Sequence, residues 1–391
     1  MVNTIIIGAG PAGSTCAAKL AEQGLDVTVI DKTRDFNDRV CGGGVGLLLE
    51  KFGLKLPEID SLRLIRGICI FDPNGNSATL FDNSQYNKDY IGWILDRNEL
   101  DKKLATIAER KGAELVLNER VRDVNYEKHS DSFVVYTDKA SYRADIVVDA
   151  SGASARIAKK FGIVRDLTAE EYRITVQAII ENNDFLPRRD YVYFYLGNKY
   201  APKSYAWVFP DGDDRIKVGL GVPKGVSANT HLRDFIRDKQ IEGRILSWRG
   251  KIVPIARTPS DLVGGPNDNV LAVGDAGRLC DALTGGGIAT AMISGECAAR
   301  AISEGHTRRY NKYLRRVRWV LWRRWLYSRF VSFDDETYRD IVAAVDNYNN
   351  SFFKTNRMEL ELARLMFAFL REKGTSMVAD FLSFHALGII L

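Results

Sequence analysis

The feature that most constrains the fold is the stretch IIIGAGPAG at residues 5–13. Three β-branched residues run into a glycine turn, and the helix-like pattern AAKLAEQG follows. This order predicts a strand, a tight turn and a helix N-terminus. Gly8 would make the turn, Gly10 would let the backbone approach a pyrophosphate, and Gly13 would let helix and strand pack closely. The free N–H groups at the start of the helix would then bind phosphate.

A second strand signal supports a dinucleotide site. The apolar run at residues 27–30 ends on Asp31. An acidic residue about 20 positions after the glycines is where such folds place the partner of a ribose hydroxyl. We therefore predict a dinucleotide-binding unit at the N-terminus, in preference to a glycine turn with a purely structural role.

Length and composition exclude several classes of protein. The chain has 391 residues, which suits two connected domains, and its 46% apolar content is enough for a large core. Its five cysteines and four histidines are scattered, which argues against a disulfide framework and a metal site. No apolar run approaches the ~20 residues needed to span a bilayer. With no signal-peptide pattern at the start, we expect a cytoplasmic protein.

The pattern along the chain predicts strands and helices in an order typical of an α/β protein. Residues 62–94 are strand-like, and Asp96 with Glu99 has the pattern of a capping box for a helix that ends near Gly112. Further short strands are predicted at 114–117, 121–126, 133–137 and 142–150. From about residue 173 to 220 apolar and polar residues alternate, which predicts a mostly antiparallel sheet.

The chain then returns to the nucleotide-binding part. A strand is predicted at 269–273, and the turn Gly285–Gly287 opens a helix through Ile302. The predicted fold class is α/β with an α+β insert: a Rossmann-like domain, an inserted antiparallel-sheet substrate domain and a helical C-terminal region. Their predicted bounds are 1–165 with 265–303, 166–264 (with strands near 62–95 contributing) and 304–391.

Four separated motifs together resemble the flavin-binding set of the FAD-dependent hydroxylase-like flavoproteins. They are GAGPAG at 8–13, Asp96-Arg97 before a helix, DASGAS at 149–154 and VGDAGRLCDALTGGGIATAM at 273–292. In that superfamily the first motif binds FAD rather than NAD. The resemblance therefore implies FAD as the cofactor.

Two further motifs narrow the resemblance to the geranylgeranyl reductase family, of the archaeal type that acts on digeranylgeranylglycerophospholipids. RVCGGGV at 39–45 is similar to the CGGG loop of that family. YAWVFP at 205–210, followed by GLG at 219–221, is similar to its YxWxFP…GxG signature. The resemblance covers residues 1–303, and RLCD at 278–281 departs from the proline-containing pattern of relatives.

The resemblance implies a set of cofactor-binding residues. Asp275 would contact the ribityl or phosphate region, and the N–H groups of Gly287 and Ile288 would face the isoalloxazine and stabilise its negative charge when reduced. A cation at a helix start opposes the helix dipole, so Arg97 is predicted to contact the cofactor. Cys41, in a glycine loop beside the flavin, is expected to tune or gate it. The predicted set is Gly8, Gly10, Ala12, Gly13, Asp31, Cys41, Gly42, Gly44, Arg97, Val121, Asp275, Gly287 and Ile288.

The second signature predicts a substrate groove. Tyr205, Trp207 and Phe209 alternate, so they share one face of a strand, which Pro210 is expected to end. An aromatic core face is the common alternative. Glycines on the return strand opposite these rings would leave a groove that suits a long, thin apolar ligand. The predicted substrate-binding residues are Trp93, Tyr205, Trp207, Phe209, Pro210, Gly219 and Gly221.

The basic character of the chain is local. The net charge is +5, and residues 305–333 hold nine arginines and lysines and no acid, together with three of the six tryptophans. A solvated helix packed on the core is one interpretation. Cations beside tryptophan on an amphipathic helix are also typical of contact with an anionic membrane surface, which we favour. No nucleic-acid-binding fold accompanies the charge.

We therefore expect an oxidoreductase acting on CH–CH groups, which saturates the geranylgeranyl chains of isoprenoid lipids at the inner face of the cell membrane. The resemblance favours prenylated glycerophospholipids as substrates. Still open are an FAD-dependent aromatic monooxygenase, a reductase of geranylgeranyl diphosphate or of an isoprenoid quinone, a non-redox flavin enzyme such as a lycopene cyclase, and a membrane-surface protein with a vestigial flavin fold. No second GxGxxG is present, so ferredoxin and NAD(P)H both remain as electron donors.

Overall fold

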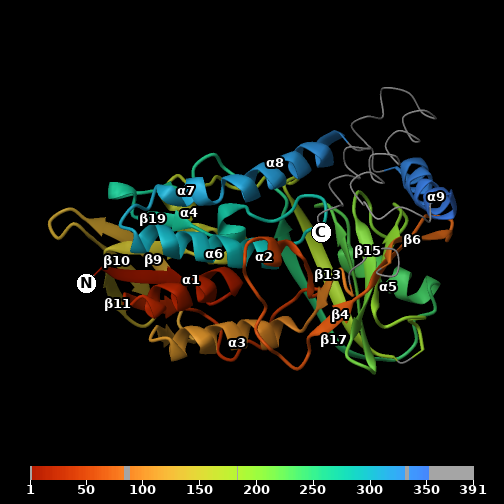
Figure 1. Cartoon of the computed structure of the whole chain (residues 1–391), viewed down its shortest axis with the longest axis horizontal. Coiled ribbons are helices and arrows are strands. Elements are labelled where there is room, and N and C mark those ends of the chain that lie inside the picture. Colours follow the sequence, from red (N-terminus) through yellow and green to blue (C-terminus); the bar gives the residue numbers. More distant parts are fainter. Residues whose placement is uncertain (1, 83–88, 183, 331–333, 352–391) are drawn as a thin grey trace.

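The computed structural model describes residues 2–82, 89–182, 184–330 and 334–351. Two large sheets lie at opposite ends of the elongated molecule, and α8 (Arg315–Phe330) runs along one side between them (Figure 1). Residues 352–391, the last part of the predicted helical C-terminal region, lie outside the described residues.

The first sheet has six strands in the order β18-β19-β12-β1-β2-β8. All its pairs are parallel except that of β18 with β19. The carboxyl ends of its parallel strands therefore meet at one edge, where open α/β sheets bind their ligands. The bounds are β1 Asn3–Ile7, β2 Asp26–Ile30, β8 Glu114–Val116, β12 Ile146–Asp149, β18 Val263–Gly264 and β19 Val270–Ala272.

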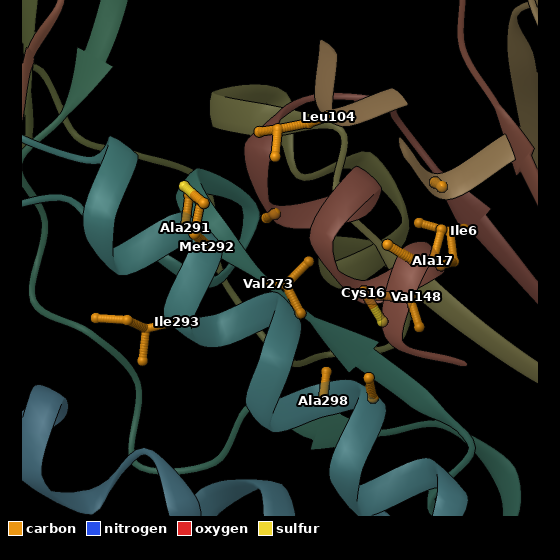
Figure 2. Close-up of a cluster of buried hydrophobic side chains, with 14 of the residues drawn as sticks. Ile6, Cys16, Ala17, Leu104, Val148, Val273, Ala291, Met292, Ile293 and Ala298 are labelled. Atoms are coloured by element: carbon orange, nitrogen blue, oxygen red, sulfur yellow. The ribbon is translucent and has the colours of Figure 1, made fainter. Parts of the chain in front are cut away.

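Helices α1 (Pro11–Glu22), α3 (Arg97–Arg110) and α6 (Ile288–Ser303) pack beside this sheet. Figure 2 shows Cys16 of α1 and Ala298 of α6 in one buried cluster with Val148 of the sheet. The helices α1 and α6 can approach closely because Gly295 has no side chain. A Cβ atom there would lie only 2.2 Å from the Ala12 carbonyl oxygen. This packing fixes the N-termini of both helices at the edge of the sheet.

The second sheet has seven strands in the order β17-β13-β16-β15-β14-β5-β6. Only the pair β14–β5 is parallel, so the mostly antiparallel sheet predicted from the alternating pattern is confirmed. Helix α5 (Ala228–Asp238) covers one face with Leu232 and Phe235. The strand bounds are β5 Gly67–Phe71, β6 Ser77–Asp82, β13 Tyr172–Glu181, β14 Tyr191–Leu196, β15 Tyr205–Asp211, β16 Arg215–Val222 and β17 Arg244–Pro254.

Two three-stranded sheets complete the architecture, in the orders β11-β10-β9 and β3-β7-β4. The single strand predicted at 142–150 is two strands, β11 and β12. Between them Asp145 accepts a hydrogen bond from Asn3 N (2.8 Å) and donates its own N–H to Asn3 O (2.9 Å), so the chain passes here from one sheet to another. The bounds are β3 Gly44–Gly46, β4 Arg63–Ile65, β7 Gly92–Ile94, β9 Val121–Glu127, β10 Ser132–Thr137 and β11 Ser141–Ala144.

Only one of the two hydrogen bonds of the predicted capping box forms at the start of α3. The Asp96 carboxylate accepts a hydrogen bond from Asn98 N at 2.7 Å. Glu99 does not complete the capping box, because its carboxylate accepts from Asp60 N (2.6 Å) and Ser61 N (2.9 Å) instead. The Asp96 N–H is bound by Ser61 Oγ at 3.0 Å, so a distant loop replaces the local partner.

The basic segment forms α7 (Arg309–Tyr313) and α8, and α9 (Asp335–Ser351) follows. Tyr310 is fully buried and donates a hydrogen bond to Ala272 O at 3.0 Å, which anchors α7 on β19. Short helices α2 (Leu48–Lys51) and α4 (Arg156–Lys160) lie in the connections. In the part of the chain that the structure describes, no helix combines the length and apolarity needed to cross a membrane.

Candidate active site

A continuous cavity of about 1500 Å³ joins the edge of the six-stranded sheet to one face of the seven-stranded sheet. Gly8 and Gly10 line one end, and Tyr205, Trp207 and Phe209 line the other. Typical small-molecule pockets hold about 300–1,000 Å³. This cavity therefore has room for a dinucleotide and a second, long ligand.

The three glycines of the first turn serve different purposes. Gly8 has φ +113°, and a Cβ atom there would lie 2.4 Å from Ala150 O. A Cβ atom on Gly13 would lie 1.9 Å from Gly8 O, so this glycine allows packing and does not line the cavity. A Cβ atom on Gly10 would meet no atom within 4 Å and would enter the cavity. Gly10 is also the N-cap of α1 and brings no side-chain cap, which leaves the helix N-terminus open to a ligand.

Asp31 holds the glycine turn in place. Its carboxylate accepts hydrogen bonds from Ala9 N and Thr33 N, both at 2.6 Å. The side chain is buried and lines the cavity. The predicted ribose partner therefore lies at the correct edge of the sheet, with both oxygens already bound to backbone.

A second helix N-terminus faces the same cavity. Gly287 is the N-cap of α6 without a side-chain cap, and the first N–H groups of a helix have no partner within the helix. Asp275 lies beside it, since a Cβ atom on Gly287 would be 3.2 Å from Asp275 Oδ1. Asp275, Gly287 and Ile288 all line the cavity. The positive end of the helix dipole is directed at this point.

These groups fit an FAD molecule. The open N-terminus of α1 would hold the diphosphate, and that of α6 would face the isoalloxazine. Val121, at the start of β9, lines the same cavity. All the predicted cofactor residues line it except Gly13, which has the packing role described above.

Arg97 is bound within the chain by a residue that the sequence interpretation missed. Its Nε and Nη2 donate to the Asp101 carboxylate at 3.0 and 3.1 Å, and Arg39 Nε lies 3.0 Å from Asp101 Oδ2. Burial lowers the pKa of Arg97, but Asp101 and the hydrogen-bonded Cys41 side chain more than offset this and raise it. The spacing of Arg97 and Asp101, four residues apart on one helix face, was a signal for this pair.

The Cys41–Gly44 loop lies between β7 and the seven-stranded sheet. Gly43 has φ +82°, and a Cβ atom there would lie 2.0 Å from Leu95 O. On the other side, a Cβ atom on Gly42 would lie 2.9 Å from the Phe209 ring. The glycines let the loop fit into this narrow space, which keeps Cys41 at the cavity.

Tyr205, Trp207 and Phe209 lie on one face of β15 and form a wall of the cavity. Phe194 joins them, with its ring centroid 5.1 Å from that of Tyr205 and 5.2 Å from that of Phe209, both edge to face. Trp207 Nε1 is buried and has no acceptor among the described residues. Trp93, on β7, also lines the cavity. The predicted aromatic face thus lines the cavity, and Trp207 and Phe209 also belong to a buried apolar cluster.

Two expectations for the second signature were wrong. Pro210 does not end its strand, because β15 continues to Asp211. At Pro210 the strand β15 is paired with β16 but no longer with β14. Proline is tolerated there because no β14 acceptor needs its missing N–H group. Gly219 leaves no open groove: it pairs with Trp207, and a Cβ atom there would lie 2.3 Å from the Trp207 ring. Of the two return-strand glycines only Gly221 lines the cavity.

The turn before α6 is held from two sides. Tyr205 Oη donates a hydrogen bond to Thr284 O, and Thr284 Oγ1 donates to Asp281 at 2.5 Å. Asp281 also forms a buried ion pair with Arg324 of α8. Burial lowers the pKa of Arg324, and Asp281 offsets part of this effect. The pair joins residues 43 positions apart, so no local sequence pattern indicated it.

The departure at residues 278–281 also has a structural role. Arg278 has φ +57° and is buried. Its Nη1 donates to Ala153 O at 2.8 Å, which ties this turn to the DASGAS segment. The buried Arg278 side chain thus fixes the local backbone of this turn.

Comparisons with known proteins agree with this geometry. The model of the geranylgeranyl reductase catalytic domain matches residues 171–253, and that of glucose inhibited division protein A matches residues 3–183. Among solved structures, a geranylgeranyl bacteriochlorophyll reductase-like protein from Thermoplasma acidophilum has a TM-score of 0.78 and 24% identity, over 100% of this chain and 99% of that one. The halogenase PltM in complex with FAD has a TM-score of 0.65 and 14% identity, over 98% and 85% of the two chains. Both show a shared fold.

Curated relatives show the family. The digeranylgeranylglycerophospholipid reductase of Methanocella arvoryzae is 35% identical over 318 residues, 77% of each chain. That of Methanosarcina mazei is 33% identical over 326 residues, 78% of this chain and 76% of the relative. The chain therefore belongs to the digeranylgeranylglycerophospholipid reductase family.

Proposed function

We propose that this protein is an FAD-dependent reductase that saturates C=C bonds in the geranylgeranyl chains of glycerophospholipids. The observation that carries the proposal is that one continuous cavity brings the open N-termini of α1 and α6 and the aromatic wall of β15 into one space. The names of the curated relatives support the substrate class.

FAD, once bound and reduced by an electron donor, would supply the hydride for such a reduction. The chain binds and orients it through the N-terminus of α1 and the Asp275–Gly287 pair. Donors at the N-terminus of α6 favour negative charge at the cavity. Asp101 fixes Arg97 beside Cys41, so the position of this cation does not depend on a ligand.

The aromatic wall would bind the prenyl chain. Apolar side chains of the seven-stranded sheet, among them Ile68, Ile70 and Val192, extend the wall toward β5. These residues exclude water from the reacting bond. Because an isolated alkene accepts hydride poorly, positive charge develops as a proton is added, and the faces of Trp207 and Phe209 would stabilise it by cation–π contact.

The test uses the holoprotein under anaerobic conditions. Dithionite-reduced protein is mixed with a digeranylgeranylglycerophospholipid, and flavin absorbance and lipid mass are followed. We expect flavin oxidation and a mass gain of two hydrogens per bond reduced. Reduced ferredoxin and NAD(P)H are compared as donors. Oxygen-dependent hydroxylation, or a product of unchanged mass, would contradict the proposal.

Two tryptophan variants test whether the aromatic wall belongs to the substrate site. Trp207→Ala should lower lipid turnover while FAD content stays near one per chain. Trp248→Ala is the control, because Trp248 packs against the cluster on the opposite face of the sheet and does not line the cavity. Equal turnover in the two variants would remove the wall from the substrate site.

We propose further that α8 holds the protein at an anionic membrane surface, at the inner face of the cell membrane. Trp319 and Trp322 are 54% and 39% exposed, and the Arg323 guanidinium lies 4.6 Å from the Trp319 ring centroid. On the other side of the helix, Val317 and Leu321 are buried and line the cavity. An exposed aromatic and cationic face on an anchored helix suits a lipid headgroup region.

Liposome flotation tests the membrane proposal. Wild type should float with vesicles containing anionic lipid and less with neutral ones, and Trp319→Ser with Trp322→Ser should reduce flotation. Arg244→Gln, on the exposed edge strand β17, is the control. Flotation that does not change in the double variant would defeat the proposal.

A further inference from the structure

A row of cations lies at the end of the aromatic wall. On β13, Arg173 and Gln177 both line the cavity, and Gln177 pairs with Gly219, whose other neighbour is Trp207. Arg173 is four residues from Gln177, which places it roughly 13 Å along the strand from the Trp207 row. Lys203, just before β15, lines the cavity as well.

Arg173 meets a second arginine, Arg329 of α8, at Glu170. Arg173 Nη1 donates to Glu170 O at 3.3 Å, and Arg329 Nη1 lies 3.1 Å from Glu170 Oε2. Both arginines line the cavity. Two guanidinium groups from different elements are thus gathered at one point of its rim.

The positive charge at this point is poorly neutralised. The Glu170 side chain is 79% exposed, so its ion pair with Arg329 is weak. Among the residues that the structure describes, no carboxylate lies within 4.0 Å of the Arg173 guanidinium or of Lys203 Nζ. Burial lowers the pKa of Arg173 and the charge of Arg329 lowers it further, whereas Tyr338 and Glu170 offset only part of this effect. An anion bound between the two arginines would relieve this repulsion.

Polar groups of the loop before β15 and of α9 also lie at this end of the cavity. Ser204 and Tyr338 line the cavity here, and Tyr338 Oη donates to Ser204 O at 3.1 Å. Asp335, one turn before Tyr338 on α9, accepts hydrogen bonds from Asn198 N (2.8 Å) and Asn198 Nδ2 (3.0 Å). Its carboxylate is therefore engaged with the loop after β14.

We propose that Arg173, Arg329 and Lys203 bind the phosphate group of the prenyl lipid. This inference rests on the proposed function and adds the part of the substrate that the aromatic wall does not explain. Guanidinium groups bind phosphate oxygens bidentately, and Lys adds a point charge. A phosphate held at the rim lets the prenyl chain follow the wall past Tyr205 to Trp207, so the site sets which bonds reach the cofactor.

The same chemistry could come from a glyceryl phosphate or from a prenyl diphosphate, so the experiment compares three substrates. They are digeranylgeranylglyceryl phosphate, geranylgeranyl diphosphate and the neutral digeranylgeranylglycerol, each with holoprotein and dithionite. Arg173→Gln and Arg329→Gln are the test variants. Arg244→Gln is the control, because its ion pair with Glu181 lies on an exposed strand away from the cavity.

We expect Arg173→Gln to raise KM roughly tenfold, or about 1.4 kcal/mol, for a phosphorylated substrate. KM and kcat for the neutral lipid should not change. Whether KM rises for digeranylgeranylglyceryl phosphate or for geranylgeranyl diphosphate shows which of the two supplies the phosphate group that the site binds. An equal loss with the neutral lipid would show a structural role and overturn the site, and so would unchanged KM with all three. Arg329→Gln, on the side of α8, gives the same readout if Arg173→Gln does not fold.

A binding measurement separates this inference from the proposed function. Saturated diphytanylglyceryl phosphate and diphytanylglycerol cannot be reduced, and their binding is followed by tryptophan fluorescence. If the preference for the phosphate form is lost in both variants although wild type reduces no lipid, the phosphate site stands and the proposed function fails. If wild type reduces lipid but shows no such preference, the function stands and the site is wrong.

Discussion

The two ends of the cavity are built in different ways. At the cofactor end the backbone forms the site. Gly8, Gly13 and Gly43 lie where a Cβ atom would be only 1.9–2.4 Å from a carbonyl oxygen. At the substrate end side chains form the site. The Trp207 ring lies against Gly219 of β16, and the Tyr205 and Phe209 rings are edge to face with Phe194 of β14. These three glycines of the cofactor end therefore cannot be replaced by a larger residue, whereas the substrate end depends on the size of the rings and on how they pack against one another.

This difference leads to four predictions, and the largest effect belongs to the backbone end. Gly13→Ala should abolish folding of the nucleotide-binding part, because its Cβ atom would lie 1.9 Å from Gly8 O and neither helix nor strand can move away. The cost exceeds the roughly 1–3 kcal/mol of ordinary overpacking. The loss of folding is measured by the yield of soluble protein and by circular dichroism.

Gly10→Ala in the same turn is the matched comparison. Its Cβ atom meets nothing within 4 Å, so the protein should fold with a nearly unchanged Tm. The methyl group would enter the space assigned to the diphosphate, and bound FAD per chain should fall. If both variants behaved alike, the glycines would not have the separate roles assigned to them.

The substitution with the next largest expected effect tests whether α8 couples the cofactor end of the cavity to the substrate end. Arg324→Met should destabilise the protein by about 3 kcal/mol, since it leaves the buried Asp281 carboxylate without its cation. Loss of this pair also frees the turn before α6, so FAD should dissociate faster. Urea denaturation and flavin release are measured, and Asp281→Asn with Arg324→Met should recover part of the stability. A stable variant with unchanged FAD release would separate α8 from the cofactor.

The same difference explains what could be predicted from the sequence. Glycine spacing reports backbone geometry directly, so the dinucleotide turn, the strand that ends near Asp149 and the Gly285–Gly287 turn were found in order along the chain. The antiparallel sheet followed from alternation, which depends only on neighbouring residues. The cofactor followed from motifs that were already in place.

Contacts between distant segments could not be predicted. The Arg324–Asp281 pair and the Glu99–Ser61 contact each join a helix to a distant loop, which only the folded chain brings together. Gly219 was misjudged for the same reason. Two glycines opposite three rings suggest open space, but whether a ring fills that space depends on the register of β15 and β16 and on the rotamer of Trp207.

A smaller effect is expected where a glycine serves a side chain. Gly219→Ala places a Cβ atom 2.3 Å from the Trp207 ring, which must shift, and we expect a loss of about 1–3 kcal/mol. Lipid turnover should fall while FAD content is kept. Gly221→Ala is the control for stability, because its Cβ atom meets Ser204 Oγ at 2.9 Å and this small side chain can rotate. Equal losses of stability in the two variants would contradict the position given to Trp207.

The smallest effect should come from the hydrogen bond that links the two ends directly. Tyr205→Phe keeps the ring in the wall and removes only the Oη–H donated to Thr284 O, a loss of about 1 kcal/mol. Burial raises the pKa of Tyr205, so the phenol keeps its proton and its role as donor through the neutral and alkaline range. Because the turn before α6 then loses one of its two supports, the flavin absorbance spectrum and the FAD dissociation rate should change, with KM for lipid nearly constant. A change in KM alone would assign Tyr205 to the substrate, and the turn before α6 would then depend on the Asp281–Arg324 pair for its connection to α8.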